Sequence, residues 1–211
     1  MASPRPKRED PDLRRARILD ETIRFVGERG YYGFTVQELA ARCGLSNAGL
    51  LYYFSSKDEL LLAALTELER RETEVIAPVI QRALRSGAKD PPAVLDVLRA
   101  MIRIGVDDPD GMRFDSVLRS EALNADHPAY SAFRSRQTGV LRLFTKLLTP
   151  HADDPRRMAR HVFAVLDGLG ELWLRSGQSF NLEDECVDAV LRWLPDLAPA
   201  KRNGRAKRAK D

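Results

Sequence analysis

The segment from Phe34 to Lys57 gathers polar side chains whose types and spacing could bind a polyanion. It reads FTVQELAARCGLSNAGLLYYFSSK and places Asn47 and Tyr52 after Ser46, which can cap a helix. Side chains on the first turns of such a helix can reach base edges in the major groove of DNA. The amides of a helix N-terminus suit phosphate oxygens. The segment therefore predicts a surface that binds double-stranded DNA.

The predicted contacts divide between bases and phosphates. Asn47 can bond an adenine edge, whereas Ala48 and the ring of Tyr52 can meet the methyl group of thymine. The hydroxyl of Tyr53 and the ammonium group of Lys57 suit phosphates. Both tyrosines could instead pack into a core. We expect the DNA-binding residues to be Thr35, Gln37, Ser46, Asn47, Ala48, Gly49, Tyr52, Tyr53 and Lys57.

Motifs that would indicate an enzyme or a cofactor site are absent from the sequence. There is no GxGxxG fingerprint after a strand, no P-loop, no HExxH and no GxSxG. The three histidines and two cysteines lack the spacing of a metal site. Gly168 and Gly170 lie in an apolar helix, where small residues let two helices approach. We therefore expect no enzyme, no catalytic residue, no cofactor and no metal.

Capping signals define the two helices that must position these side chains. Thr35 and Glu38 form a capping box that opens the first helix. Gly44 ends it, and Ser46 caps the second, so about three residues join two short helices. The apolar face of the first helix comprises Val36, Leu39, Ala40 and Cys43. This is the spacing of a helix-turn-helix.

The order of motifs over residues 13–65 is specific. It comprises Thr35, Glu38-Leu39-Ala40, Gly44-Leu45-Ser46, Leu50, Tyr52-Tyr53-Phe54 and Ser56-Lys57, followed by an acidic pair and Leu60. The region resembles the TetR family of bacterial transcriptional regulators. Gly49 and Leu51 depart from the family pattern, in which Thr and Tyr are frequent, so a hydroxyl is lost at each position. The resemblance implies a dimeric regulator whose middle helices bind a small molecule and whose last two helices dimerise.

Hydrophobic periodicity predicts helices along the rest of the chain, and no segment alternates as a strand would. We expect an all-α fold of about nine helices. Pro78 should kink or end the helix that starts at Ser56. Residues 107–111 should form a turn before a short helix over 114–123. Later helices are expected over 127–148, 158–173 and 182–194.

About 140 residues follow the helix-turn-helix, and they are rich in large apolar side chains. These could simply fill a core, but as a group they favour a pocket for a largely apolar or aromatic ligand. His161 or Asp167 would supply an orienting hydrogen bond. We expect the ligand-binding residues to be Met101, Ile104, Phe114, Leu118, Phe133, Phe144, His161, Phe163 and Asp167.

The last two predicted helices are apolar on more than one face, which indicates burial on several sides. Two copies of this helix pair would form a symmetric four-helix interface. The residues predicted to form it are Leu166, Leu169, Trp173, Val187, Val190, Leu191 and Leu194.

The charge is unevenly distributed along the 211 residues. The net charge is +3, with +3 over residues 1–57, −5 over 58–200 and +5 over 201–211. A basic end suits a polyanion. The longest purely apolar run has six residues, against about 20 for a membrane span. We expect a cytoplasmic protein that has no membrane partner and keeps its two cysteines reduced.

The sequence predicts four regions. They are a flexible basic arm over 1–12, a helix-turn-helix domain over 13–57, a helical effector-binding and dimerisation domain over 58–197 and a basic disordered tail over 198–211. The expected function is that of a homodimeric DNA-binding regulator, more specifically a repressor released from a palindromic operator by a small molecule. Two alternatives are an adaptor controlled by a protein partner and an enzyme on a helical scaffold.

Overall fold

The computed structural model describes residues 10–198, which contain nine α-helices, one short 3-10 helix and no strand. The all-α prediction is confirmed. The helices are α1 (Pro11–Arg29), α2 (Val36–Arg42), α3 (Asn47–Tyr53), α4 (Lys57–Arg85), α5 (Pro91–Asp107), α6 (Pro109–Glu121), α7 (Tyr130–Leu148), α8 (Pro155–Arg175) and α9 (Leu182–Trp193), followed by the 3-10 helix η1 (Pro195–Leu197). Most of the predicted arm and tail lies outside the described residues.

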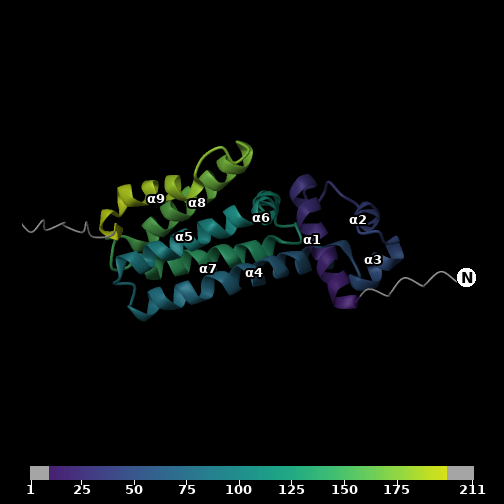
Figure 1. Cartoon of the computed structure of the whole chain (residues 1–211), viewed down its shortest axis with the longest axis horizontal. Helices are drawn as coiled ribbons and strands as arrows, with labels where there is room; N and C mark the ends of the chain where they lie inside the picture. Colours follow the sequence, from purple (N-terminus) through teal and green to yellow (C-terminus); the bar gives the residue numbers. More distant parts are fainter. Residues whose placement is uncertain (1–9, 199–211) are drawn as a thin grey trace, which may run out of the picture.

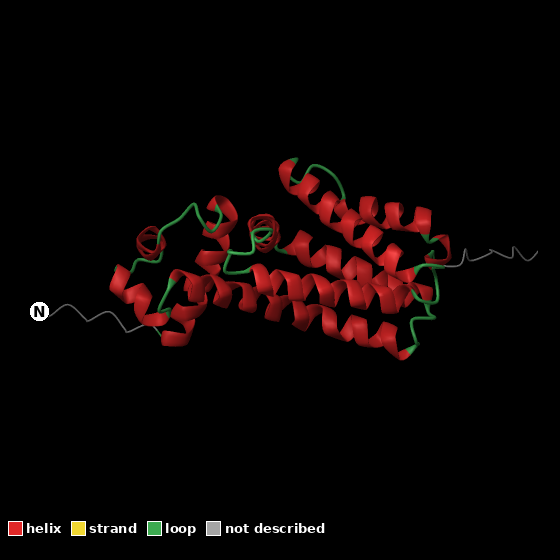
Figure 2. Cartoon of the chain, turned by 180° about the vertical axis from the view of Figure 1, so that it is seen from behind, coloured by secondary structure: helices red, strands yellow, loops and turns green. Residues whose placement is uncertain are grey.

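The molecule is elongated, with α1, α2 and α3 gathered at one end (Figure 1). Helices α4, α5 and α7 run lengthwise, and α8 and α9 lie along one side of them, as the view from behind also shows (Figure 2). Helix α6 lies between the two parts and packs against α1, α5 and α8. No helix in residues 10–198 is long and apolar enough to cross a bilayer.

The capping signals read from the sequence form the helix-turn-helix as expected. The Thr35 hydroxyl accepts from the backbone N–H of Glu38 at 3.2 Å, and the Glu38 carboxylate accepts from the N–H of Thr35 at 2.7 Å. Gly44 has a φ of +67°, a conformation that Gly adopts without a steric penalty. The Ser46 hydroxyl then accepts from the N–H of Gly49 at 3.0 Å and opens α3.

The predicted turn over residues 107–111 was wrong. Asp108 alone separates α5 from α6, and its carboxylate caps α6 by accepting from the N–H of Gly111 at 2.9 Å. Pro109 occupies the first helical position, where a missing N–H costs nothing. Residues that usually indicate a turn here start a helix, so α6 begins five residues before the predicted Phe114.

Other helix boundaries also differ from the prediction, including those of α8, which spans Pro155–Arg175 rather than 158–173. Helix α4 continues through Pro78, because Pro removes one N–H and apolar side chains on both sides of it stay packed. Helix α7 begins at Tyr130 because His127 turns back and its Nδ1 accepts from the N–H of Ala129 at 3.1 Å. Helix α1 begins at Pro11, so the last two residues of the predicted arm belong to it.

Two hydrophobic cores share the long helix α4. The N-terminal core joins α1, α2, α3 and the first half of α4, and it also includes Phe114, Leu118 and Phe133 from α6 and α7. The C-terminal core joins the second half of α4 to α5, α7, α8 and α9. The packing around the helix-turn-helix therefore extends past Lys57, where the sequence placed a domain boundary.

Candidate nucleic-acid interface and ligand cavity

Helix α3 presents a polar face to solvent and a single buried anchor to the core. Leu50 is fully buried, whereas Asn47, Ala48 and Tyr52 are exposed, Tyr52 to 85%. Tyr52 therefore does not pack into the core, which was the alternative considered for both tyrosines. Tyr53 is half-buried against the N-terminal core, and its ring meets that of Tyr52 edge-on at 5.4 Å.

The remaining predicted contact residues surround this face. Gln37 is exposed on α2, while the hydroxyls of Thr35 and Ser46 cap α2 and α3. At Gly49 an added Cβ would lie 3.2 Å from the Ser46 hydroxyl, so a larger residue would crowd the cap. All of these positions except that of Gly49 are exposed, and α2 and α3, which carry or adjoin them, lie together at one end of the molecule (Figure 1).

Lys57 has internal contacts that the sequence did not reveal. Its ammonium donates to the backbone carbonyl of Phe34 at 2.6 Å and lies 4.4 Å and 4.3 Å from the ring centroids of Tyr31 and Phe34. Burial lowers its pKa, opposed by the nearby carboxylates of Asp58, Glu121 and Glu38. Lys57 thus ties the start of α4 to the residue that precedes the cap of α2. Its contact with phosphate remains a prediction.

Contacts of two arginine side chains hold α2 and α3, the two helices of the helix-turn-helix, against α1. Arg42 of α2 pairs with Glu21 at 2.6 Å and Glu28 at 2.9 Å, both on α1, and its guanidinium also covers the ring of Phe25. Arg15 of α1 lies 4.9 Å from the ring centroid of Phe54, just after α3. The orientation of α2 and α3 is therefore set by α1.

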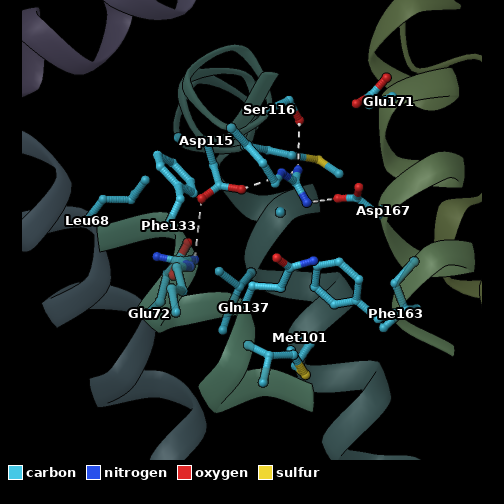
Figure 3. Close-up of a pocket in the computed structure, with 18 of the residues that line it drawn as sticks. Leu68, Glu72, Met101, Asp115, Ser116, Phe133, Gln137, Phe163, Asp167 and Glu171 are labelled. Carbon is cyan, nitrogen blue, oxygen red and sulfur yellow. Dashed lines mark hydrogen bonds and ion pairs between the residues drawn. The ribbon is translucent and has the colours of Figure 1, made fainter. Parts of the chain in front are cut away.

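A cavity of about 770 Å³ lies among α4, α5, α6, α7 and α8, with α9 at its end (Figure 3). This volume falls within the range of small-molecule sites. The predicted ligand-binding residues that line it are Met101, Ile104, Phe133, Phe144, Phe163 and Asp167.

Three predicted ligand-binding residues lie elsewhere, and these assignments were wrong. Phe114 and Leu118 are fully buried in the N-terminal core, because their i, i+4 stripe on α6 faces α1 rather than the cavity. His161 lies on the outer face of α8, where its ring meets that of Trp193 at 5.6 Å. Periodicity identified apolar stripes but not the neighbour that each stripe faces.

The cavity wall holds a charged cluster of which only Asp167 was among the predicted ligand-binding residues. It consists of Glu72 on α4, Asp115 and Arg119 on α6, Arg136 on α7 and Asp167 on α8, and all five line the cavity. Arg119 pairs with Asp167 and with Asp115. Arg136 pairs with Glu72 at 2.5 Å. The i, i+4 spacing of Asp115 and Arg119 was the one signal available from sequence.

The pKa of Glu72 reflects its position in this cluster. Burial raises the pKa of Glu72 above its ordinary value, and the Arg136 guanidinium opposes that shift. Burial lowers the pKa of Arg136, but the carboxylates of Asp115, Glu72 and Glu69 outweigh it and leave that pKa raised. The cavity wall therefore holds charges that are removed from water and depend on one another.

The predicted dimer residues are largely buried within the chain. Trp173, Val187, Val190 and Leu194 belong to the C-terminal core, and the indole N–H of Trp173 donates to the carbonyl of Phe180 at 3.0 Å. Leu166 lines the cavity, and Leu169 and Leu191 are half-buried. In this part of the fold α8 packs on α7 and α9, and α9 packs on α5 and α8, so the four buried residues expose almost no area to a second copy.

A different face of the same helix pair is exposed. Leu172 on α8 is 57% exposed and Trp193 on α9 is 44% exposed. Ala164 and Gly168 lie on the same side of α8 as Leu172, along a shallow groove. Added to Gly168, a Cβ would meet nothing within 4 Å.

The histidines and cysteines of the described part of the chain form no metal site. No group of three or more His, Cys, Asp or Glu residues there could hold a metal ion. Cys43 and Cys186 are both free and buried, and burial raises the pKa of Cys186 to about 12.

Comparison with known proteins adds a family and its relatives. Residues 18–64 match the family of bacterial regulatory proteins, tetR family. The HTH-type transcriptional regulator BetI of Stenotrophomonas maltophilia is 32% identical over 189 residues, which cover 84% of this chain and 90% of the relative. The HTH-type transcriptional regulator PksA of Bacillus subtilis is 35% identical over 97 residues, 46% of this chain and 45% of that protein.

Solved structures share the fold at lower identity. AibR, in complex with isovaleryl coenzyme A and operator DNA, matches with a TM-score of 0.67 and 19% identity, over 86% of this chain and 98% of its own. SCO4454, a TetR-family transcriptional regulator from Streptomyces coelicolor, matches with a TM-score of 0.64 and 24% identity, over 87% and 96%.

Proposed function

This chain belongs to the TetR family of bacterial transcriptional regulators, and on that premise we propose that it is a homodimeric repressor that leaves its operator when a small molecule fills the cavity. The relatives are DNA-binding regulators and not enzymes, and so is this chain. Residues 13–57 would bind the operator, and residues 58–197 would bind the effector and the second copy.

The position of α6 is the observation that carries this proposal. Asp115 and Arg119 on one face of α6 line the cavity, while Phe114 on another face is buried beside α1. The two helices approach closely, since a Cβ added at Gly27 of α1 would lie 3.2 Å from the backbone nitrogen of Phe114. A ligand that shifts α6 must therefore repack α1, on which the reading helices are fixed.

A hydrogen bond gives α6 a second link to the DNA-binding region. The Glu121 carboxylate at the end of α6 accepts from the backbone N–H of Tyr31 at 2.8 Å, just before α2. Release would require the ligand to bind one of two dimer states more tightly than the other. Coupling of about 1–3 kcal/mol is typical of such switches.

The proposed dimer places two copies of α3 on one face of the DNA. A two-fold axis beside α8 would bring the exposed Leu172 and Trp193 of both copies together. Helix-turn-helix dimers read half-sites about 34–36 Å apart or a multiple of that distance.

Selection of binding sites from random duplex DNA tests the proposal. We expect a palindromic consensus, and we expect one or more compounds from a library of apolar and aromatic metabolites to release the protein from it. A selected site without two-fold symmetry would contradict the dimeric mode of reading. Release by no compound, together with no ligand-induced rise in melting temperature, would favour control by a protein partner.

Control by a protein partner is the second candidate. The exposed apolar face of α8 and α9 could receive such a partner instead of a second copy. The cavity favours a small molecule, because an adaptor has no need of a 770 Å³ cavity lined by side chains from six helices.

A further inference from the structure

The wall of the cavity holds more acidic than basic side chains. Its acidic members are Glu72, Asp108, Asp115, Asp167 and Glu171, and its basic members are Arg119, Arg134 and Arg136. Asp108 is committed to capping α6, and Glu171 pairs with the exposed Arg175 at 3.1 Å. These two carboxylates have partners of their own, and Arg134 is exposed, so the balance is decided by the charged cluster and by Glu69, which lies one helical turn before Glu72 on α4.

Two arginines of the charged cluster serve four carboxylates. Arg136 pairs with Glu72 at 2.5 Å and with the adjacent Glu69 at 3.3 Å. Arg119 pairs with Asp167 and, at 3.3 Å, with Oδ2 of Asp115. The four carboxylates, Asp115 included, carry two more negative charges than the two guanidinium groups neutralise, and Asp115 contacts both arginines (Figure 3).

Asp115 carries an acceptor that the protein leaves unused. Its Oδ1 is buried and accepts no hydrogen bond from residues 10–198, the nearest guanidinium nitrogen of Arg136 lying 3.6 Å away. A buried carboxylate oxygen without a donor is destabilising, because it has lost contact with water and gained no hydrogen bond in return. A ligand with a positively charged N–H group would donate a hydrogen bond to Asp115 and would also compensate the excess negative charge.

Aromatic side chains line the rest of the cavity. Phe133, Phe144 and Phe163 line it together with Met101, and Figure 3 shows Phe133 and Phe163 on either side of the drawn space. Such rings take an apolar body, and a ring face also attracts a cation. A ligand with a charged head and an apolar tail would match both parts of the wall.

We propose that the effector is an amphiphilic amine, with an N–H-bearing ammonium or guanidinium head bound by Oδ1 of Asp115 and an apolar body against Phe133 and Phe163. This inference rests on the proposed function and narrows the chemical class of its ligand. A carboxylate head would instead meet the excess of negative charge. A neutral head could donate to Asp115 but would leave that charge uncompensated.

Four compounds with the same eight-carbon tail test the head group: octylamine, octyltrimethylammonium, octanol and octanoate. Calorimetry at pH 7 should show octylamine binding at least tenfold more tightly than octanol, and octanoate more weakly still. Octyltrimethylammonium should bind at least fivefold more weakly than octylamine, because it has no N–H. Equal affinity of these two cations would overturn the hydrogen bond to Asp115.

Asp115→Asn removes the charge and tests the residue. It should weaken octylamine binding at least tenfold and change octanol binding less than twofold, which also shows that the cavity is intact. Asp110→Asn is the matched control, since Asp110 is exposed on the same helix and does not line the cavity. Unchanged octylamine affinity in Asp115→Asn would overturn the proposal.

Release from the selected DNA site separates the two proposals. If octanoate or octanol releases the protein and octylamine does not, the ligand class is wrong and the ligand-released repressor stands. If none of the four binds or releases the protein, the proposed ligand class is wrong, and the metabolite library then decides whether the ligand-released repressor stands.

Discussion

Asn47 and Tyr52 project from α3 into solvent, while Leu50 between them is buried. Leu50 therefore holds the helix on the core, and the two exposed side chains are free to contact DNA. Asn47 lies in the first turn, where side chains meet base edges most directly. Helix α3 has seven residues and no charged side chain, so its contribution to DNA binding is expected to be specific rather than electrostatic.

Asn47→Ala should weaken binding to the selected site by about 1–3 kcal/mol and relax the preference at one base pair per half-site. A side-chain amide can form two hydrogen bonds with an adenine edge, and Ala can form none. Titration of fluorescent duplexes with each base substituted in turn measures both effects. Leu51→Ala on the same helix is the control. A mutant with unchanged specificity would show that Asn47 is not a base contact.

Lys57→Ala tests a residue that has two candidate roles. Loss of the hydrogen bond to the Phe34 carbonyl should lower the free energy of unfolding by about 1–3 kcal/mol, as for other hydrogen bonds to a charged group. Loss of a phosphate contact should weaken all duplexes about equally and reduce the salt slope by about 1.

Denaturant unfolding and binding at several salt concentrations separate these roles of Lys57. Lys89→Ala, at an exposed position far along the chain, is the control. A stable mutant with an unchanged salt slope would exclude both roles.

At the scale of elements, helix starts were predictable where a cap and a first turn agreed, as at Thr35 with Glu38 and at Ser46. Helix starts were not predictable where the same residue types occur both in turns and at helix N-termini. Asp108 and Pro109 could begin either, and only the packing of α6 against α1 decides between them. The same limit applies to the cavity. Most of its apolar lining residues could be predicted from periodicity, but its ion pairs could not, because they join residues from four helices whose packing the sequence does not show.

The glycines of α8 show the same limit of sequence reasoning. At Gly170 an added Cβ would collide only with the terminal methyl of the flexible Met112 side chain from α6, so this glycine makes room for a side chain and not for a neighbouring backbone. Gly168, two residues earlier, faces open space. The spacing of the two glycines could not show which of them has a neighbour.

Pro78→Ala should raise the free energy of unfolding by about 1–3 kcal/mol. Pro inside a helix costs roughly 3 kcal/mol through a missing hydrogen bond and a steric clash, offset by up to about 1 kcal/mol from the stiffer unfolded chain. Pro78 is exposed inside α4, so the change disturbs no core. Urea unfolding measures it. A destabilised mutant would mean that α4 requires the distortion that Pro78 imposes.

At the scale of the whole molecule, two hydrophobic cores share the long helix α4. The DNA-binding helices lie near its start, and the cavity lies farther along it. At about 1.5 Å per residue, the 29 residues of α4 extend roughly 44 Å. A small reorientation of the helices around the cavity can therefore displace α3. In a dimer such displacements change the separation of the two α3 helices, which the spacing of the half-sites does not tolerate.

Leu172→Asp should convert the dimer to a monomer, because it places a charge in the centre of the exposed apolar face of α8. Light scattering at micromolar concentration should give about 24 kDa for the mutant and twice that mass for the unmodified protein. Val75→Asp, at an exposed apolar position on α4, should leave the mass unchanged. A monomeric unmodified protein would refute the dimer.

The extension of the N-terminal core past Lys57 bears on how parts of such regulators can be exchanged. A hybrid that fused residues 1–57 to a foreign effector region would retain every predicted DNA-contacting side chain but lose the first half of α4 as well as Phe114, Leu118 and Phe133 from this core. Each large apolar side chain removed from a packed interior costs about 2–5 kcal/mol. A graft that also transplants the first half of α4, α6 and the first turn of α7 would preserve that interior. The smallest part of this protein that could be transferred with its DNA-binding core intact is therefore discontinuous in sequence. A functional hybrid would have to include all of its segments.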